Sequence, residues 1–327
     1  MAWDRPDVIV VGAGIVGASI AWRLAQAGVR VRIADAGTLG GEASSAGAGM
    51  LAPSGEFEGQ APLAVLGAES QRLYPGFVRE LEAESGLQID FAICGSLDLS
   101  PGAPERARRQ AQSGMRPETT AEGVIYPNDG FVDPTDVLKA LRCALDRRHA
   151  DLREQCRITR VDSAEARAIV LSAGAWSSEI ELTHNGRRLT LVKALPVKGH
   201  LLGYQLEPGS LPRILRRGHT YILQRSSGFT IAGSNEQRIG FDRHVDEHIC
   251  HEIEERAAEL WPRLRNETPV RRWIGFRPST ENMELQMRRI PETNVWLAYG
   301  HFRNGILLAP VTAQRIAAEI IASLGTD

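Results

Sequence analysis

The feature that most constrains this fold is a glycine-rich motif near the start of the chain. Residues 12–17 read Gly-Ala-Gly-Ile-Val-Gly, the G-x-G-x-x-G spacing of dinucleotide-binding turns. Gly12 allows a tight turn, and Gly14 lets a pyrophosphate approach the backbone. Gly17 lets the following helix pack closely on the strand. Because the motif alone is a weak signal, its flanking segments decide its meaning.

Those flanks form the context that the motif requires. Residues 7–11, apolar after Asp7, suit a buried parallel strand, and residues 15–27 have helical spacing, with Gly28 where a helix-ending glycine belongs. Residues 29–35 read as a second strand that ends at Asp35, whose carboxylate can bond the hydroxyl of an unphosphorylated ribose. A Gly-rich turn without a ligand is the alternative. We predict a Rossmann-type βαβ unit that binds a dinucleotide.

The rest of the chain predicts a second domain and a discontinuous first one. The fold class is α/β: a Rossmann-type cofactor domain with a second, mostly antiparallel α+β domain that binds the substrate. Residues 189–233 are strand-like and often broken by Gly and Pro. The predicted domains comprise residues 1–88, 132–180 and 285–327, and residues 89–131 and 181–284.

Further elements follow from local patterns. Helices are expected at 63–85, 132–149, 245–260 and 305–323, and apolar strands at 168–172 and 295–299. Asp133 is a candidate N-cap with Pro134 in the first helical position. Residues 40–53 are predicted to form a small-residue loop, 89–99 a strand pair and 101–120 a surface excursion.

Composition excludes several partners. A net charge of −2 argues against nucleic acid, because phosphate binding needs a basic surface. The four cysteines are scattered without a Cys-x-x-Cys pair, which favours a reducing cytoplasm over a disulfide framework.

Residues 8–22 are uncharged but short for a membrane span and preceded by Asp4 and Asp7, so no membrane association is expected. The oligomeric state is open, a homo-oligomer included.

Two long motifs at opposite ends carry a family resemblance. The stretch Ala43-Ser44-Ser45-Ala46-Gly47-Ala48-Gly49-Met50-Leu51-Ala52-Pro53 resembles the flavin-contact loop of the D-amino-acid oxidase superfamily. Residues 300–310, 195–199 and 275–278 resemble the same family. The pattern is most similar to the bacterial glycine oxidases of the thiazole-biosynthesis type, and it runs from Val8 to Ile320.

The resemblance implies that the dinucleotide is FAD. Residues 301–307 should surround the isoalloxazine edge, where the N-terminus of the following helix would stabilise negative charge. The residues expected to contact FAD are Gly12, Gly14, Ile15, Val16, Gly17, Asp35, Ala36, Ala43, Ser44, Ala48, Gly49, Met50, Ile158, Gly174, His301, Arg303, Asn304, Gly305, Ile306 and Leu307. Related sarcosine oxidases attach FAD to a cysteine near the position of Arg277; no cysteine follows Cys250, which predicts noncovalent FAD.

The resemblance also implies an amine substrate that carries a carboxylate. Arg277 and Arg303 are the candidate anchors, since a guanidinium holds a carboxylate bidentately and so orients the Cα–H over the flavin. Tyr221 matches a family position that lines the substrate pocket. Each could instead be an ordinary surface arginine or sheet tyrosine. The implied reaction is hydride transfer from glycine or an N-substituted glycine, giving glyoxylate with ammonia or a primary amine, and hydrogen peroxide after reoxidation by oxygen.

Three departures from the family pattern bear on the substrate. Residues 281–288 lack the usual Asp-Pro-Ile-Gly continuation, the stretch 158–168 lacks inserted hairpins, and the excursion at 101–120 is short. A more open pocket would favour an N-alkylated glycine over glycine. The alternatives are a sarcosine or D-amino-acid oxidase or dehydrogenase of the same superfamily, and a non-catalytic FAD-binding partner protein.

A histidine cluster offers a competing metal site. His244, His248 and His251 share one face of the helix expected at 245–260. The apolar residues Ile249, Ile253, Ala257 and Leu260 form the opposite stripe, which places the histidines in solvent. No functional metal is therefore expected.

Overall fold

The first body is built on a mostly parallel sheet. The structure, a computed structural model, describes residues 5–55, 61–112 and 114–325. The six strands lie in the order β19-β20-β11-β1-β2-β9, and only β19 is antiparallel to its neighbour. Their bounds are β1 Val8–Val11, β2 Val31–Ala34, β9 Asp151–Arg153, β11 Ala168–Leu171, β19 Gln286–Arg289 and β20 Val295–Tyr299.

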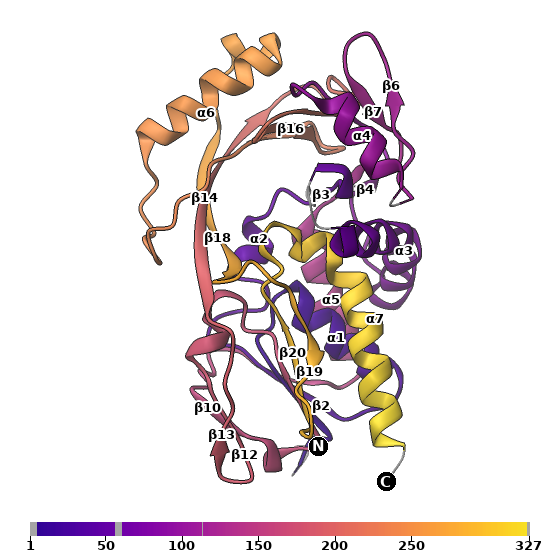
Figure 1. Cartoon of the computed structure of the whole chain (residues 1–327), viewed down its shortest axis with the longest axis vertical. Helices are drawn as coiled ribbons and strands as arrows, with labels where there is room; N and C mark the ends of the chain where they lie inside the picture. Colours follow the sequence, from indigo (N-terminus) through magenta and orange to yellow (C-terminus); the bar gives the residue numbers. More distant parts are fainter. Residues whose placement is uncertain (1–4, 56–60, 113, 326–327) are drawn as a thin grey trace.

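Different layers cover the two faces of this sheet (Figure 1). On one face, Val8, Val10 and Val170 pack against four helices. These are α1 Ile15–Gln26, α3 Ala61–Ser85, α5 Pro134–Arg147 and α7 Gly305–Leu324. On the other face, Ile9 and Leu171 pack beneath a small sheet of β10 Arg160–Asp162, β12 Glu181–His184 and β13 Arg187–Arg188. Because both faces of β1 are buried, its sequence is uninterruptedly apolar.

Helix α5 begins, and helix α1 ends, where the sequence predicts. Asp133 is the N-cap of α5, accepting a hydrogen bond from the backbone N–H of Thr135 at 2.8 Å. Gly28 follows α1 with φ +78°, the left-handed conformation that glycine adopts freely.

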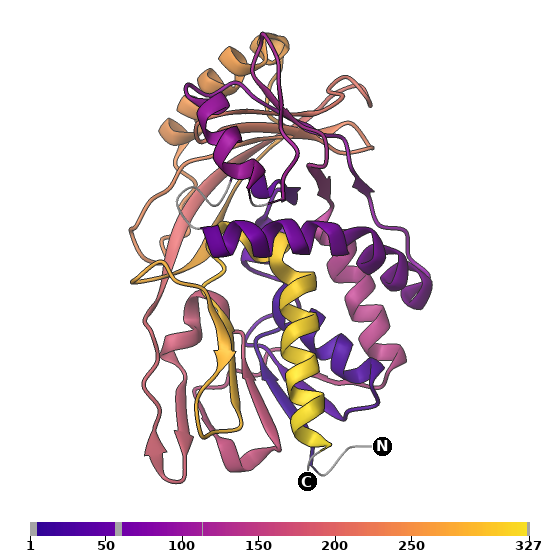
Figure 2. The same ribbon diagram turned by 45° about the vertical axis from the view of Figure 1, so that its right-hand side comes forward.

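Helix α7 is a core element. Residues 302–324 are long and apolar enough to cross a membrane by composition alone. However, α7 packs against α1 and α3, and Leu307, Ile316 and Ile320 are buried in the main core (Figure 2). Its hydrophobicity is therefore that of a core helix.

The second body is a curved sheet of eight strands. Their order is β18-β14-β17-β16-β15-β5-β7-β6, and only the β15–β5 pair is parallel. Their bounds are β5 Ser96–Asp98, β6 Glu118–Thr119, β7 Val124–Tyr126, β14 Ala194–Gln205, β15 Ile214–Arg217, β16 Thr220–Gln224, β17 Phe229–Gly233 and β18 Arg271–Thr280. Helix α6, Glu247–Leu260, covers the outer face through Ile253 and Ala257 (Figure 1).

The inner face of this curved sheet meets the first body. Leu201, Leu223 and Ile231 pack there against Ala48 and Phe131. Phe131 belongs to a three-stranded junction of β3 Met50–Leu51, β8 Gly130–Val132 and β4 Phe91–Ala92, and Ala48 lies just before β3. The short elements that complete the chain are α2 Ala43–Ala46, α4 Ala103–Ala111, η1 Pro53–Gly55, η2 Ser163–Glu165, η3 Gly174–Glu179, η4 Pro262–Asn266 and η5 Phe302–Asn304.

Two local predictions were wrong, and a third, the surface excursion, left out a helix. The predicted loop 40–53 contains the one-turn helix α2 and strand β3. The predicted strand pair at 89–99 is two strands, β4 and β5, that belong to different sheets. The predicted excursion at 101–120 contains the helix α4, whose Ala103 and Ala107 pack on Val124 and Tyr126. These elements are too short for a hydrophobic period to show in the sequence.

We propose the discontinuous domain division with one refinement. The parallel sheet draws its strands from residues 8–34, 151–171 and 286–299, and the curved sheet from 96–126 and 194–280. This supports the proposed segments 1–88, 132–180 and 285–327 for the first domain. Strands β12 and β13 lie beyond residue 180 but pair with β10 on the first body, so we place 181–188 there too.

Candidate functional site

A cavity of about 680 Å³ runs between the two bodies. This volume lies within the usual range of small-molecule sites, roughly 300–1,000 Å³. The parallel sheet contributes the carboxyl ends of β1 and β2, where such sheets commonly bind ligands. The curved sheet contributes residues of β14, β16 and β18 from the opposite side.

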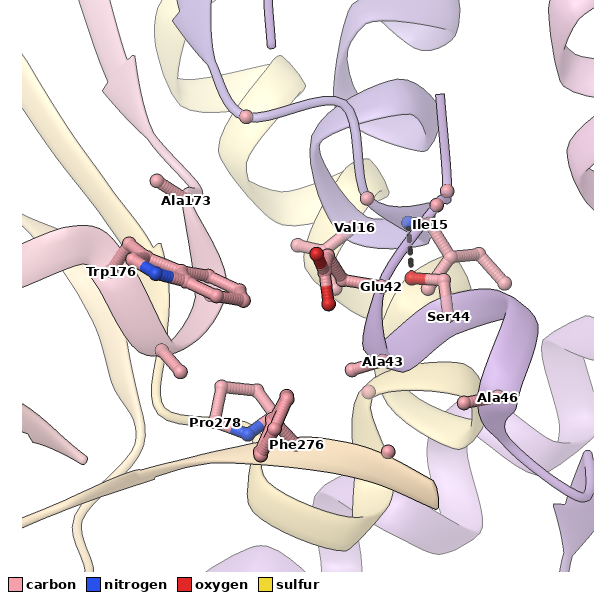
Figure 3. A pocket seen from close by; sticks show the side chains of 18 of the residues that line it. Ile15, Val16, Glu42, Ala43, Ser44, Ala46, Ala173, Trp176, Phe276 and Pro278 are labelled. Carbon is pink, nitrogen blue, oxygen red and sulfur yellow. Dashed lines mark hydrogen bonds between the residues drawn. The ribbon is translucent and has the colours of Figure 1, made fainter. Parts of the chain in front are cut away.

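At one end, the N-terminus of α1 faces the cavity. Gly12 has φ +102°, and a Cβ there would lie 2.4 Å from the carbonyl oxygen of Ser172, so no other residue fits. Gly14 is the N-cap of α1 and provides no side-chain cap. The Ile15 N–H donates to Ser44 Oγ at 2.9 Å (Figure 3). The positive end of the helix dipole at this point suits a negatively charged pyrophosphate.

Asp35 is held rigidly where β2 ends. Its Oδ2 accepts the N–H of Ala13 at 2.7 Å, and its Oδ1 accepts the N–H of Gly37 at 2.8 Å. Each carboxylate oxygen retains capacity for a further hydrogen bond, as a ribose hydroxyl would require. Ile158 also lines this end of the cavity. The arrangement suits the nucleoside half of FAD.

At the other end, the loop 46–50 and the start of α7 meet. Gly49 has φ +85°, and a Cβ there would lie 1.9 Å from the carbonyl oxygen of Val132. From the C-terminal side, His301 is fully buried, and its Nε2 lies 3.1 Å from Thr312 Oγ1. Burial lowers the pKa of His301 to about 4, so the ring is neutral at pH 7. A flat apolar ring system fits this end.

Arg277 projects from the interior of β18. Its Nη1 donates to the carbonyl oxygen of Asn235 at 2.9 Å, and its Nη2 donates to Ser234 Oγ at 2.8 Å. Gly199 on the neighbouring strand β14 leaves the space for this guanidinium, because a Cβ there would lie 2.2 Å from Nη1. Three neighbours therefore fix the position of this guanidinium.

The other two predicted substrate residues line the same cavity. Arg303 lies in η5, with its Nη1 3.3 Å from Glu236 Oε1, and Tyr221 lies in β16. Both arginines thus contact consecutive residues of the segment 234–236. The cavity brings together two guanidinium groups that are far apart in the sequence.

Nearly all the predicted FAD contacts line this cavity, and two do not. Gly17 lies behind the wall, where a Cβ would meet the Gly12 carbonyl oxygen at 2.1 Å, so its role is close packing of α1. Leu307 is buried in the helical core. The predicted residues that line the cavity are Gly12, Gly14, Ile15, Val16, Asp35, Ala36, Ala43, Ser44, Ala48, Gly49, Met50, Ile158, Gly174, His301, Arg303, Asn304, Gly305 and Ile306.

Sequence reasoning missed an aromatic and ionic wall. Trp176 stacks on Phe241 with ring centroids 4.5 Å apart, and Phe241 meets Phe276 edge-on at 5.5 Å. Arg243 lies over Phe276 and pairs with Glu42 at 2.7 Å. Figure 3 shows Trp176, Glu42 and Phe276 around the cavity. Only the Gly-Ala-Trp run after β11 offered a local signal, because the other contacts join distant loops.

Two departures from the family pattern lie away from the cavity. Among the described residues, none from 101–112 or 114–120 and none from 281–288 contributes to its wall. Between 158 and 168 the chain forms β10 and η2 without a hairpin.

Two of the three histidines, His248 and His251, lie on the solvent face of α6, whereas His244 precedes the helix, which begins at Glu247, so the three do not share one helical face. His248 and His251 are largely exposed and approach glutamates of their own helix at 3.4 Å. Cys250, Ile253 and Ala257 face the core. Within the ranges that the structure describes, no group of three or more potential metal ligands was found.

Comparisons with known proteins agree with this geometry. The sequence model of the FAD dependent oxidoreductase family matches residues 7–319. The chain is 31% identical to a glycine oxidase of Geobacillus kaustophilus over 96% of this chain and 92% of that protein. It is 30% identical to a glycine oxidase of Pseudomonas aeruginosa, with 95% and 93% covered. The crystal structure of the Geobacillus kaustophilus glycine oxidase superimposes with a TM-score of 0.88 at 29% identity, covering 97% of this chain and 95% of that one.

Proposed function

Because the chain belongs to the FAD dependent oxidoreductase family and is an FAD-dependent amino-acid oxidase, we propose that it oxidises glycine or an N-substituted glycine. The observation that carries this proposal is the preorganised Arg277 in the same cavity as the glycine motif. An amino acid with a short side chain would place its carboxylate on Arg277 and its Cα toward the loop 46–50 and His301. FAD, when bound, supplies the acceptor for a hydride from that Cα.

The protein contributes orientation and electrostatics. The Arg277 fork holds the carboxylate in one geometry, and its hydrogen bonds to Ser234 and Asn235 prevent rotation away from the substrate. Arg303 and Tyr221 complete the proposed substrate pocket. The N-terminus of α7 and the neutral His301 face the end where negative charge accumulates on reduction.

The proposed products follow from the bonds broken. Loss of hydride from Cα and a proton from nitrogen leaves an imine, and water converts it to glyoxylate plus ammonia, or plus a primary amine when the nitrogen is substituted. Oxygen takes the two electrons and two protons and leaves as hydrogen peroxide. We also propose noncovalent FAD and a cytoplasmic location, since the four cysteines are free and none lies after Cys250.

A substrate panel tests the proposal. Purified enzyme should release peroxide with glycine, sarcosine or a bulkier N-substituted glycine, and their kcat/KM values identify the natural class. Arg277→Lys should lower kcat/KM about 100-fold through loss of one arm of a bidentate bond and its geometry. Arg271→Lys, on the same strand but against Trp273, is the matched control and should keep full activity.

The panel also separates the alternatives. Flavin bleaching without peroxide would indicate a dehydrogenase, and strict preference for a D-amino acid would indicate a D-amino-acid oxidase. Bound FAD that no amine in the panel bleaches under anaerobic conditions would contradict a catalytic role. Strict glycine preference would reject the larger N-substituted substrates.

A further inference from the structure

A buried arginine lies directly behind the loop 46–50. Arg225 follows β16, and only 4% of it is exposed. Its Nη2 donates to the carbonyl oxygen of Ala48 at 2.6 Å, and its Nη1 lies 3.6 Å from Asp133 Oδ2. Phe131 contacts the guanidinium from one side. Among the described residues, no hydrogen-bond partner was found for its Nε and Nη1.

This charge is costly to keep. Burial lowers the pKa of Arg225, and Asp133 compensates only in part. Removing such a cation from water costs several kcal/mol even after relaxation. An apolar side chain of the same length would fill the space without that cost. The position therefore indicates a use for the guanidinium beyond packing.

The bond to Ala48 sets the orientation of two peptide groups. In a planar trans peptide the N–H points away from the carbonyl. Arg225 holds the Ala48 carbonyl, and the Val132 N–H holds the Gly49 carbonyl at 2.9 Å. Arg225 and Val132 are not part of the cavity wall, whereas Gly49 and Met50 are. The N–H groups of Gly49 and Met50 therefore point toward the cavity.

We propose that Arg225 is a positioning residue for the FAD ring, which aims the Gly49 and Met50 N–H groups at the ring and places a positive charge behind them. The inference rests on the proposed contact between residues 48–50 and the flavin. It is independent of which amine is oxidised. Reduction adds negative charge to the ring, so oriented donors and a buried cation bind the reduced cofactor more tightly than the oxidised one.

The midpoint potential of the bound FAD measures this preference directly. Arg225→Met should weaken the preference for reduced over oxidised FAD about tenfold, which lowers the potential by about 30 mV for a two-electron couple. Arg225→Lys keeps the charge without the fork, so its potential should stay nearer that of the wild type. The Kd of FAD, measured by fluorescence quenching on the apoprotein, should rise in both variants.

Asp133→Asn gives a test with the opposite sign. Asparagine caps a helix as well as aspartate does, so α5 should keep its start while Arg225 loses its counter-charge. The potential should rise. Arg216→Met is the matched control, because Arg216 is a buried arginine on β15 that contacts Ser54 and Asp129, away from the cavity. It should lose stability without a change in potential.

The outcomes separate this inference from the proposed function. A wild-type potential in Arg225→Met, or a fall in potential in Asp133→Asn, overturns the positioning role even if glycine is oxidised normally. If Arg225→Met does not retain FAD, the midpoint potentials of Arg225→Lys and Asp133→Asn test the positioning role instead. Loss of glycine turnover with the expected potential shifts would instead count against the proposed substrate.

Discussion

Replacing Gly199 with alanine should damage catalysis far more than stability. Gly199 lies on β14 beside Arg277 of β18, and an added Cβ would lie 2.2 Å from Nη1 and 2.4 Å from Nη2 of that guanidinium. Non-bonded heavy atoms keep about 3.5 Å apart, so the guanidinium must move by roughly 1 Å. The atoms that collide are the far end of a flexible side chain, so the strand pairing can stay intact.

The expected magnitude follows from that displacement. The shift breaks the hydrogen bonds of Arg277 to Ser234 and Asn235 and removes the anchor from its preorganised place. A misplacement of about 1 Å can lower the rate about 100-fold. We expect kcat/KM for the best amine of the panel to fall by about that factor. FAD content and the unfolding midpoint should change little.

Steady-state peroxide assays on variants with verified FAD content measure this effect. Gly203→Ala is the matched control, because Gly203 lies on β14 like Gly199 but outside the cavity wall. Its added Cβ would lie 2.4 Å from the ring of Phe229. That control should cost stability and leave kcat/KM within a few-fold. Wild-type kcat/KM in Gly199→Ala at full FAD content would refute the role given to the position of Arg277.

Three further predictions concern the cofactor end. Ser44→Ala leaves the Ile15 N–H at the start of α1 without its acceptor and should raise the Kd of FAD about fivefold. Ser45→Ala, at an exposed neighbouring position, is the control and should leave the Kd unchanged. Equal Kd values for the two variants would exclude a role for the Ser44 hydrogen bond in FAD binding. Because the pKa of His301 is about 4 when folded and about 6.5 when unfolded, the unfolded chain takes up the proton first as pH falls. The apoprotein should therefore lose about 2 kcal/mol of stability between pH 7.5 and pH 5. Urea unfolding of His301→Gln should lack this part of the pH dependence, and an unchanged dependence would assign it elsewhere. Acid precipitation should release all yellow colour, and flavin retained on the polypeptide would disprove noncovalent binding.

The local motifs allowed much of the fold to be read from the sequence. The strand 8–11, the helix that follows it and the α5 cap at Asp133 all match the structure, because each depends on neighbours within a few residues. Strand β20 matches at both ends. The short strands β4 and β5 were misassigned because their partners lie in other parts of the chain.

The sequence by itself predicted a dinucleotide site, and the family resemblance implied that the dinucleotide is FAD. A turn that needs Gly12, a helix N-terminus behind it and Asp35 after the next strand form one local constellation, so spacing alone predicts it. Only the tertiary structure decided which side chains act beside it. Arg277 is oriented by Gly199 and residues 234–235, and Arg225 reaches Ala48 across 177 positions of the chain. The physical reason is that hydrogen bonds and packing act over only a few ångströms. The residues that contact Arg277 and Arg225 are remote in the sequence, and only the folding of the chain brings them within that range.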